Sequence, residues 1–260
     1  TQTITIVDTT GPELFVPPSY EADCTQELFL FDALASDNCS NAEIIVEESY
    51  DYTCNNSYVL TRTFTATDDC GNQTVGTQEI TVSDTTAPEF TFVPADYTAE
   101  CSDEHPMDDA SATDNCGEVS ISVEEVTTPG ACAGDYTITR TFTATDDCGN
   151  ATTATQTITI VDTTAPVLTI PADYTAECSD EHPMDDASAT DNCGEVSISV
   201  EEVTTPGACA GDYTITRTFT ATDDCGNATT ATQTITIVDT TAPEFTFVPA
   251  DYTIECDQEL

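Results

Sequence analysis

The sequence predicts an all-β protein in which one small β-sheet unit recurs along the chain. Between residues 213 and 222, Thr fills every even position while Tyr, Ile, Arg, Phe and Ala fill the odd ones, and residues 230–237 alternate again. Alternation with β-branched residues on one face is typical of half-buried strands. The Asp-Cys-Gly-Asn segment at 224–227 indicates a hairpin turn between the two runs, because Gly and Asn tolerate the positive φ that such turns need.

The same hairpin recurs throughout the chain. Residues 94–166 and 171–243 are identical, at a spacing of 77 residues, and residues 9–84 are a diverged copy. Internal repeats are sought first, because they show how the chain is divided into structural units. We therefore expect the last strand of a preceding repeat at 1–8, repeat 1 at 9–84, repeat 2 at 85–162, repeat 3 at 163–239, and the start of a further repeat at 240–260.

Each repeat is predicted to be a small immunoglobulin-like β-sandwich. In repeat 3 a first strand over 167–178 is interrupted at Pro171, a weaker strand follows over 180–191, residues 196–200 alternate cleanly, and the hairpin completes the repeat. Five or more short antiparallel strands in so few residues are typical of such sandwiches. The linker 162–166 is short and contains Pro166, so we expect stiff joints and an elongated stalk of tandem repeats.

The charge balance excludes several classes of partner. Forty-nine Asp and Glu residues face only three Arg and no Lys among 260 residues. A chain so acidic cannot neutralise phosphates, so we expect no nucleic-acid partner and no binding to an anionic membrane surface. No apolar run approaches about twenty residues, so we expect no direct membrane insertion.

The thirteen cysteines are spaced evenly rather than in C-x-x-C pairs. This pattern favours a disulfide framework and an extracellular location over zinc or iron–sulfur ligation. Four cysteines in a repeat allow three pairings, and spacing alone cannot choose among them. If successive strands reverse direction, two cysteines lie where the chain leaves the repeat (the trailing end) and two where it comes in (the leading end). We therefore expect two disulfides per repeat: Cys24–Cys54, Cys39–Cys70, Cys101–Cys132, Cys116–Cys148, Cys178–Cys209 and Cys193–Cys225. Cys256 matches the first cysteine of a repeat, and its partner is expected beyond residue 260.

Acidic residues are predicted to gather at the same ends. The strand directions bring the aspartate at each linker together with those of the Asp-Asn-Cys and Asp-Asp-Cys motifs. Many hard oxygen ligands suit calcium, which takes six to eight of them. The alternative is that these aspartates only form turns and keep the surface soluble, and no loop of the D-x-D-x-D-G kind is present. The predicted calcium ligands are Asp8, Asp37, Asp68, Asp84, Asp114, Asp146, Asp162, Asp191 and Asp223, and no organic cofactor is expected.

The sequence carries little that points to catalysis. Arg62, Arg140 and Arg217 each fall on the apolar face of a strand, where an arginine must be paired, so we expect a structural ion pair with a carboxylate. No activated Ser or Cys with a His partner is recognisable, and neither G-x-S-x-G nor H-E-x-x-H occurs. We therefore expect that the protein is not an enzyme.

Three motifs carry a resemblance to a known family. Pro-Ala-Asp-Tyr-Thr-Ala-Glu-Cys, Ala-Thr-Asp-Asn-Cys and Thr-Phe-Thr-Ala-Thr-Asp-Asp-Cys-Gly-Asn resemble the hyalin-repeat (HYR) type of immunoglobulin-like module. They are more closely similar to the cysteine-bearing repeats of giant cell-surface adhesins of Bacteroidota, of the SprB gliding-adhesin type. The resemblance implies type IX secretion, cell-surface display, calcium dependence, and an adhesive or filamentous role that includes gliding motility.

A second resemblance concerns modification. The Asp-Thr-Thr sequence at each linker resembles the motif on which Bacteroidota attach O-linked glycans, which implies glycosylation at Thr9, Thr85, Thr163 and Thr240. The alternative is a turn with good local hydrogen bonding.

Two functions follow from these expectations. The first is a non-catalytic stalk segment of a long repetitive adhesin or filament, whose partners are the neighbouring repeats of the same chain. The second is that each repeat binds a glycan or another cell weakly and that many repeats act together, with surface polysaccharide or other cells as partners. We rank the binding function below the stalk function because the chain has no Trp, and carbohydrate sites usually present exposed aromatic rings.

Overall fold

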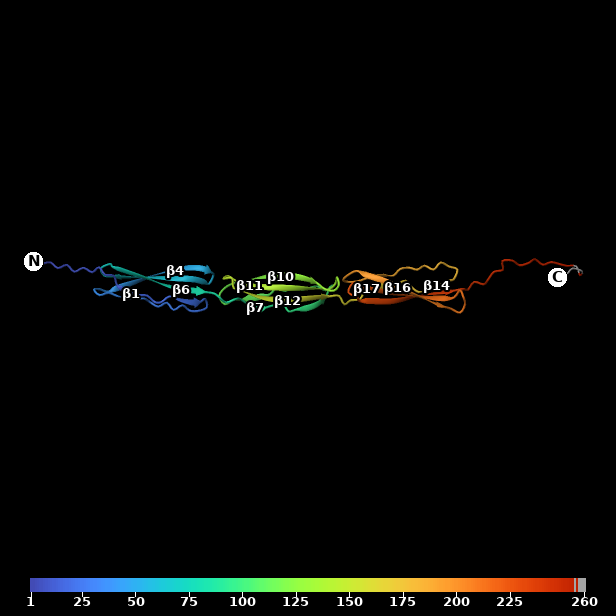
Figure 1. Ribbon diagram of the computed structural model, residues 1–260, viewed down its shortest axis with the longest axis horizontal. Helices are drawn as coiled ribbons and strands as arrows, with labels where there is room; N and C mark the ends of the chain where they lie inside the picture. Colours follow the sequence, from blue (N-terminus) through green and yellow to red (C-terminus); the bar gives the residue numbers. More distant parts are fainter. Residues whose placement is uncertain (255, 257–260) are drawn as a thin grey trace. The chain divides into compact units, whose positions relative to one another are not determined.

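The computed structural model describes residues 1–254 and 256, and it confirms the all-β prediction (Figure 1). Each repeat contains a four-stranded and a two-stranded sheet, so small two-sheet units recur in tandem. The described residues form strands and no helix, and accordingly none of their elements is an apolar helix able to span a membrane.

The strands of the three repeats correspond one to one. The four-stranded sheets have the orders β2-β6-β5-β4, β8-β12-β11-β10 and β14-β18-β17-β16, and the two-stranded sheets are β1-β3, β7-β9 and β13-β15. The strands are β1 (Glu13–Phe15), β2 (Tyr20–Asp23), β3 (Leu34–Ser36), β4 (Ala42–Cys54), β5 (Ser57–Asp68), β6 (Gln73–Ser83), β7 (Glu89–Phe92), β8 (Tyr97–Glu100), β9 (Ser111–Thr113), β10 (Val119–Pro129), β11 (Tyr136–Asp146), β12 (Ala151–Val161), β13 (Val167–Thr169), β14 (Tyr174–Glu177), β15 (Ser188–Thr190), β16 (Val196–Pro206), β17 (Tyr213–Asp223) and β18 (Ala228–Val238).

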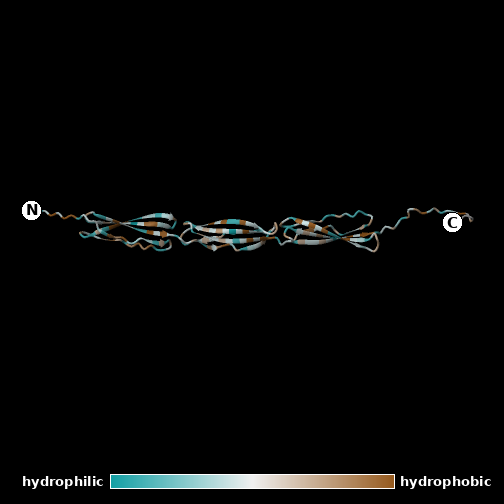
Figure 2. Ribbon diagram, viewed as in Figure 1, coloured by the Kyte–Doolittle hydropathy of each residue, from teal (hydrophilic) through white to brown (hydrophobic). Residues whose placement is uncertain are grey.

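The predicted hairpin is confirmed as β17 and β18. The strands pair antiparallel, and the turn between them contains Gly226 at a φ of 91°, a value that only glycine adopts readily. The alternation of hydropathy along such strands is visible in Figure 2. Phe219, Ala221, Ile235 and Ile237 are at most 2% exposed, whereas the intervening threonines are only half-buried. The alternation therefore separates a core face from a partly solvated face.

Three details differ from the sequence-based expectation. β14 runs parallel to β18, and β2 runs parallel to β6, although all neighbouring strands were expected to be antiparallel. The expected first strand over 167–178 is divided at Pro171 into β13 and β14, which join different sheets. The chain therefore crosses from one sheet to the other there, because proline cannot donate to a sheet ladder. Of the weak strand expected over 180–191, only β15 forms.

The two flanking segments form no strands in the described residues. Residues 1–8 were expected to be the last strand of a preceding repeat, but Ile4 and Ile6 are 77% and 91% exposed and have no partner strand there. Residues 240–254 are similarly without strands, and Phe245 is 90% exposed. A β-strand needs a neighbour to satisfy its backbone groups, so an alternating pattern alone does not form one.

The described chain forms two compact units whose boundary runs through repeat 2. One unit comprises residues 1–99, 104–128 and 137–159, and the other comprises residues 100–103, 129–136 and those from 160 onward. The joint between repeats 1 and 2 therefore lies inside the first unit, and the joint between repeats 2 and 3 lies inside the second.

Candidate functional site

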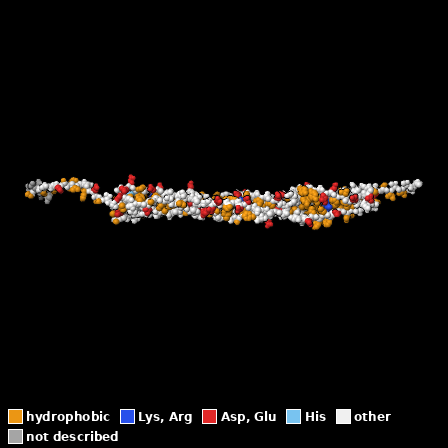
Figure 3. Space-filling view, turned by 180° about the vertical axis from the view of Figure 1, so that it is seen from behind, with side chains coloured by type: hydrophobic (Ala, Val, Ile, Leu, Met, Phe, Trp, Pro, Cys, Tyr) orange, Lys and Arg blue, Asp and Glu red, His pale blue; other side chains and the backbone are white. Residues whose placement is uncertain are grey.

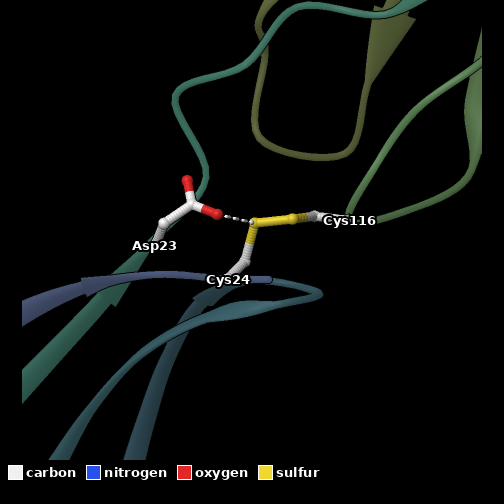
Figure 4. Close-up of side chains that lie close together, drawn as sticks. All are labelled: Asp23, Cys24 and Cys116. Carbon is white, nitrogen blue, oxygen red and sulfur yellow. Dashed lines mark hydrogen bonds between the residues drawn. A yellow bond between two sulfur atoms is a disulfide. The ribbon is translucent and has the colours of Figure 1, made fainter. Parts of the chain in front are cut away.

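Disulfides join consecutive repeats at both joints. Cys24 bonds to Cys116 and Cys54 to Cys148 at the first joint, with Cα atoms 6.0 and 5.2 Å apart. The first of these bonds is drawn in Figure 4, where a carboxylate oxygen of Asp23 lies 3.8 Å from Cys24 Sγ. At the second joint the bonds are Cys101–Cys193 and Cys132–Cys225, with Cα separations of 5.9 and 5.0 Å. Disulfide bonding is thus confirmed, but every partner differs from the expected one.

Sheet order explains why pairing within a repeat was wrong. The strand directions did place Cys24 and Cys54 at one end, because β2 and β4 both run toward the linker that follows β6. However, β2 and β4 are the two edges of the sheet β2-β6-β5-β4. Three strand spacings separate them by about 14 Å, whereas a disulfide needs Cα atoms within roughly 7 Å. The strands that precede Cys101 and Cys132 are likewise opposite edges of their sheet, as are those that precede Cys178 and Cys209.

The bonds predicted at the leading ends, Cys116–Cys148 and Cys193–Cys225, are also wrong, but for a different reason. Cys116 and Cys148, which were expected to bond to each other, are each bonded to the preceding repeat, and so are Cys193 and Cys225. The short linker presents the leading end of one repeat to the trailing end of the one before. Among the described residues, Cys39, Cys70, Cys178, Cys209 and Cys256 are unbonded and exposed, so the predicted Cys39–Cys70 bond is also absent.

Three predicted calcium ligands come together at the first joint. Asp84 follows β6, Asp114 follows β9, and Asp146 ends β11, and each offers a carboxylate oxygen within 4.8 Å of the others. Asp84 and Asp146 are 8% and 6% exposed. We call these three residues the joint triad. Oδ2 of Asp114 is buried without a hydrogen-bond partner, so this oxygen is available to a cation.

Other oxygens of the triad accept hydrogen bonds from backbone N–H groups and from the side-chain amide of Asn150. Asp146 Oδ1 accepts hydrogen bonds from the N–H groups of Cys148 and Asn150, both at 2.9 Å, and its Oδ2 accepts one from Asn150 Nδ2 at 2.9 Å. Asn150 Nδ2 also donates to the carbonyl of Asp84 at 3.2 Å, which connects the turn of repeat 2 to the linker. Asp114 Oδ1 accepts from the Cys116 N–H at 2.8 Å. These contacts orient the carboxylates before any ion is bound.

Electrostatics at the triad are unfavourable without a cation. Burial raises the pKa of Asp84 above its ordinary value, and the charges of Asp114 and Asp146 raise it further. Burial also acts to raise the pKa of Asp146, but the hydrogen bonds from Asn150, Cys148 and Gly149 together outweigh burial, so that the pKa of Asp146 is lowered. Three carboxylates so close repel one another unless a proton or a cation intervenes.

The second joint has the same arrangement. Burial and then the charges of Asp191 and Asp223 raise the pKa of Asp162. Oδ1 of Asp191 is buried without a hydrogen-bond partner, like Oδ2 of Asp114. Asn227 Nδ2 donates to Asp223 Oδ2 and to the carbonyl of Asp162, at 2.9 and 3.0 Å. The chemistry at this joint is therefore that of the first.

The leading end of repeat 1 provides the third set of predicted ligands. Asp8 and Asp37 offer oxygens within 4.8 Å of each other and of Cys39 Sγ. Asp8 Oδ2 is buried and has no hydrogen-bond partner. Asn72 Nδ2 donates to Asp68 Oδ2 at 2.8 Å and to the carbonyl of Asp8 at 3.4 Å. All nine predicted aspartates thus lie at equivalent places in the three repeats.

The Asp-Thr-Thr linkers form hydrogen-bonded turns. Asp84 Oδ1 accepts a hydrogen bond from the N–H of Thr86 at 3.0 Å, and Asp162 Oδ1 accepts one from Thr164 at 3.2 Å. The Thr163 hydroxyl donates to Glu100, and the Thr240 hydroxyl donates to Glu177. The side chains expected to carry glycans are all exposed: Thr9, Thr85, Thr163 and Thr240. Glycosylation remains a prediction, and at Thr163 and Thr240 it competes with these hydrogen bonds.

The arginines form the expected ion pairs. Arg140 is 2% exposed, and its Nε donates to Glu125 Oε1 at 2.9 Å. Its Nη1 donates to the carbonyl of Asp108 at 2.7 Å and to Gln156 Oε1 at 3.1 Å, while its guanidinium lies 4.9 Å from the centre of the Phe142 ring. Arg62 and Arg217 pair with Glu48 and Glu202 in the same way. These arginines connect adjacent strands.

Two groups of residues at these sites were not predicted. The asparagines at 72, 150 and 227 link the carboxylates to the linker, and their place in the repeated Asp-Asp-Cys-Gly-Asn motif was the signal that could have identified them. Glu202 and Gln233 lie directly opposite Arg217 on β16 and β18. Finding these two partners requires the strand register, which the sequence alone does not provide.

Comparisons with known proteins agree with the repeat structure. A family model described as "HYR-like domain with 4 cysteines" matches residues 91–160 and 166–237, which make up more than half of the chain. No curated protein matches the chain.

Among solved structures the similarity is distant. Drosophila N-cadherin EC1-4 has 13% identity and a TM-score of 0.32, with 90% of this chain and 77% of that chain covered. Protocadherin gammaB7 EC3-6, solved as a cis-dimer, has 15% identity and a TM-score of 0.33, with coverage of 88% and 77%. PcdhgB3 EC1-4 has 13% identity and a TM-score of 0.34, with coverage of 90% and 77%. At these TM-scores no property of those proteins transfers to this chain.

The family match and the structure describe the same unit. The first match runs from β7 to β12, the second runs from the residue before β13 to β18, and each contains the four cysteines that the family description states. The chain therefore belongs to the family of HYR-like domains with four cysteines.

Proposed function

We propose that this chain is a non-catalytic stalk segment of a long repetitive cell-surface adhesin or filament, in which disulfides and calcium hold consecutive repeats together. The observation that carries the proposal is the placement of two disulfides at each joint, together with the joint triad at the first joint and the interacting carboxylates of Asp162, Asp191 and Asp223 at the second. HYR-like repeats are extracellular, non-enzymatic modules, which agrees with this role. The repeat boundaries that the proposal uses are 9–84, 85–162 and 163–239, with partial repeats at 1–8 and 240–260.

Disulfides across a joint carry load differently from disulfides within a module. A bond inside one repeat protects that repeat alone, whereas two bonds from one repeat to the next give a second covalent path beside the linker. Tension on the chain is then shared among three covalent connections at each joint. Such a design suits a filament that must transmit force between a cell and a surface.

Calcium fits the joint triad by the chemistry of its donors. All of the available atoms are hard carboxylate oxygens, and the buried oxygen of Asp114 has no other partner. Asp84, Asp114 and Asp146 would hold the ion at the first joint, and Asp162, Asp191 and Asp223 at the second. The acidic surface visible in Figure 3, where red side chains are numerous and blue ones are scarce, also favours cations over anions as ligands.

The substitution Asp114→Asn tests the calcium proposal. Asparagine keeps an oxygen for the Cys116 N–H but removes one charge from the triad. In EDTA the variant should melt higher than the wild type, because repulsion is relieved. With calcium at about a hundred times its dissociation constant the wild type should gain about 2.7 kcal/mol, and most of the gain at this joint should be lost in the variant.

Asp147→Asn is the matched control, because it removes the same charge from an exposed neighbour of Asp146. It should leave the calcium-induced gain unchanged. Melting that is the same in calcium and in EDTA for the wild type would remove calcium from the proposal. Small-angle scattering of the 260-residue protein tests the stalk itself: chelation and reduction should each broaden its distribution of lengths, and an unchanged distribution would contradict a role for the joints.

A recurring pocket supports a second candidate function. A pocket of about 290 Å³ beside the edge strand β10 is lined by Asp109, Ala110, Ile121, Val123 and Phe142. The equivalent pocket in repeat 3, of about 300 Å³, is lined by Asp186, Ala187, Ile198, Val200, Arg217 and Phe219. Equivalent pockets in successive repeats would allow weak contacts with surface polysaccharide or other cells to add up. A glycan array probed with the whole chain tests this candidate, and the absence of binding at high protein density would exclude it.

A further inference from the structure

Repeat 1 exposes aromatic side chains at four positions where repeats 2 and 3 have none. Phe29, Phe31, Tyr50 and Tyr52 are 67%, 64%, 47% and 63% exposed. In Figure 3 hydrophobic side chains gather densely over part of repeat 1 on the face in view. Exposed apolar clusters on a soluble protein mark interaction sites. We call these four residues the aromatic strip.

Hydrogen bonds identify the positions equivalent to the two phenylalanines. The carbonyl of Phe29 accepts from a tyrosine hydroxyl at 3.3 Å, as the carbonyl of Pro183 does at 2.9 Å in repeat 3. The carbonyl of Phe31 accepts from the buried arginine of repeat 1 at 2.8 Å, as the carbonyl of Asp185 does from that of repeat 3 at 2.9 Å. The backbone is therefore held in the same way, and only the side chains differ.

The strand register identifies the positions equivalent to the two tyrosines. Tyr52 of β4 lies directly opposite Tyr58 of β5, whereas Pro206 lies opposite the equivalent Tyr213. Two residues before Pro206, at the place of Tyr50, repeat 3 has threonine, and repeat 2 is identical to repeat 3 at all four positions. The same scaffold folds with proline, aspartate and threonine at these places, so packing of the repeat does not account for the aromatic rings.

The aromatic strip extends across the width of the four-stranded sheet. Tyr20 of β2, Ile80 of β6, Leu60 of β5 and Tyr50 of β4 lie in one row on the same face of the sheet. Hydrogen bonds to the Tyr20 hydroxyl hold the backbone of Phe29 at one edge, and Tyr50 lies at the other. Three strand spacings separate these edges by about 14 Å. A surface of this length accommodates an extended, chain-like ligand.

The rings are ordered by contacts with one another. The ring centroids of Phe29 and Phe31 are 6.5 Å apart, and those of Tyr50 and Tyr52 are 6.2 Å apart, with 18° between the planes in each pair. Tyr58 lies 5.5 Å from both Tyr50 and Tyr52. Aromatic pairs at about 4.5–7 Å attract each other, so these rings lose little freedom when a ligand binds.

The charged groups beside the aromatic strip are carboxylates. The Tyr50 hydroxyl donates to Glu48 Oε2 at 3.4 Å, and Glu48 Oε1 accepts from the buried Arg62 at 3.0 Å. Beside Phe29 there is a pocket of about 360 Å³, lined by Tyr20, Glu21, Ala22, Gln26, Glu27 and Phe29 itself. An ionised carboxylate only accepts hydrogen bonds, so a matching ligand must supply donors and must not be anionic.

We propose that the aromatic strip of repeat 1 binds a neutral glycan, whose sugar rings lie against the aromatic rings and whose hydroxyl groups donate to the neighbouring carboxylates. Sugar rings combine apolar C–H faces with many O–H donors, which matches this surface. An anionic polysaccharide would be repelled by the net charge of −46, and an apolar protein segment would leave the carboxylates without donors. The proposal depends neither on the stalk role nor on the pockets of repeats 2 and 3, because it concerns a different site.

The double variant Tyr50→Thr and Tyr52→Thr tests the proposal in the 260-residue protein. Threonine is the residue that repeat 3 has at the place of Tyr50, so this side of the repeat tolerates it. Phe31→Asp tests the other half of the aromatic strip with the residue of repeats 2 and 3. The matched control is Tyr252→Thr, which removes a tyrosine that is 73% exposed outside the aromatic strip. Melting curves verify that each variant is folded at the temperature of the binding assay.

A panel of immobilised neutral oligosaccharides, including cellohexaose and chitohexaose, identifies what the wild type binds. Titration with intrinsic tyrosine fluorescence then gives the dissociation constant, because the chain has no Trp. The wild type and Tyr252→Thr should bind a neutral oligosaccharide equally, and the double variant and Phe31→Asp should bind it at least about tenfold more weakly. Hexagalacturonate, which has acidic groups on rings of the same size, should not bind.

Three results would overturn the proposal. The first is that the wild type binds no neutral oligosaccharide of the panel. The second is that the double variant binds as tightly as the wild type, because the glycan would then lie elsewhere, for example in the pockets of repeats 2 and 3. The third is that hexagalacturonate binds more tightly than the neutral oligosaccharides, because the carboxylates beside the aromatic strip would then not select the ligand.

Discussion

Replacement of Cys101 and Cys193 by serine removes one of the two bonds between repeats 2 and 3. The bond closes a loop of 92 residues. In the chain-entropy account a loop of that length contributes about 4–5 kcal/mol to stability, and measured values for native disulfides are typically about 2–4 kcal/mol. We therefore expect the double variant to lose about 2–4 kcal/mol of unfolding free energy, and its melting temperature to fall by roughly 5–15 °C.

The chain contains its own control for this experiment. Cys178 lies in the same local sequence as Cys101 but is unbonded, so Cys178→Ser should change the unfolding free energy by less than about 0.5 kcal/mol. Denaturant unfolding followed by circular dichroism measures both variants. If Cys178→Ser costs as much as the double substitution, the bonds do not cross the joint and the reasoning is refuted. Disulfide mapping should use a protease that cleaves at acidic residues, because the chain has only three sites for trypsin.

Three further predictions concern single residues. Arg140→Met should cost about 2–4 kcal/mol in denaturant unfolding, because it leaves the buried Gln156 Oε1 and the carbonyl of Asp108 without their arginine donor, and a cost below about 1 kcal/mol would show that the arginine is not structural. Hydrogen bonds from the side chain and backbone of Thr163 lower the pKa of Glu100, so its folded pKa lies below its unfolded value. The resulting stabilisation is complete above an unfolded pKa of about 4.3 and is lost as pH falls through the folded pKa, so the melting temperature of Glu100→Gln should fall less than that of the wild type in acid. Equal slopes would contradict this assignment. Gly226→Ala should cost about 1–3 kcal/mol because the residue has a φ of +91°, although its Cβ would meet nothing within 4 Å. Gly194→Ala, where φ is not positive and the nearest atom is 3.7 Å away, should be close to neutral, and equal costs would show that backbone conformation is not the cause.

Local pattern was sufficient to predict the strands of the hairpin and the class of the fold. Alternation along residues 213–222 and 230–237 reflects the two faces of a strand, which is a property of each residue and its immediate neighbours. The strand directions expected from the sequence placed each cysteine at the correct end of its repeat. They also brought the predicted aspartates Asp84, Asp114 and Asp146 together, because each follows or ends a strand that points toward the joint.

The parallel strand pairs could not be predicted from alternation and strand direction. β14 could pair with β18 or lie against another strand, and the sequence of Tyr174–Glu177 is compatible with either. A parallel pair needs a long connection, and the chain supplies one by crossing to the two-stranded sheet and back. Only packing of the whole repeat decides which edge the short strand occupies.

The sequence by itself determined the β-class, the 77-residue repeat and the end of the repeat at which each cysteine and aspartate lies, because these depend on alternation, identity and strand direction. The tertiary structure alone decided which cysteines bond and which side chains pair with the arginines. Bonding between Cys101 and Cys193 depends on the order of strands in a sheet and on the close approach of two repeats. Strand order and the approach of two repeats both depend on which residues far apart in the chain come close in space. The pattern of residues along the chain gives the direction of each strand and the face on which each side chain lies, but it does not give those distances.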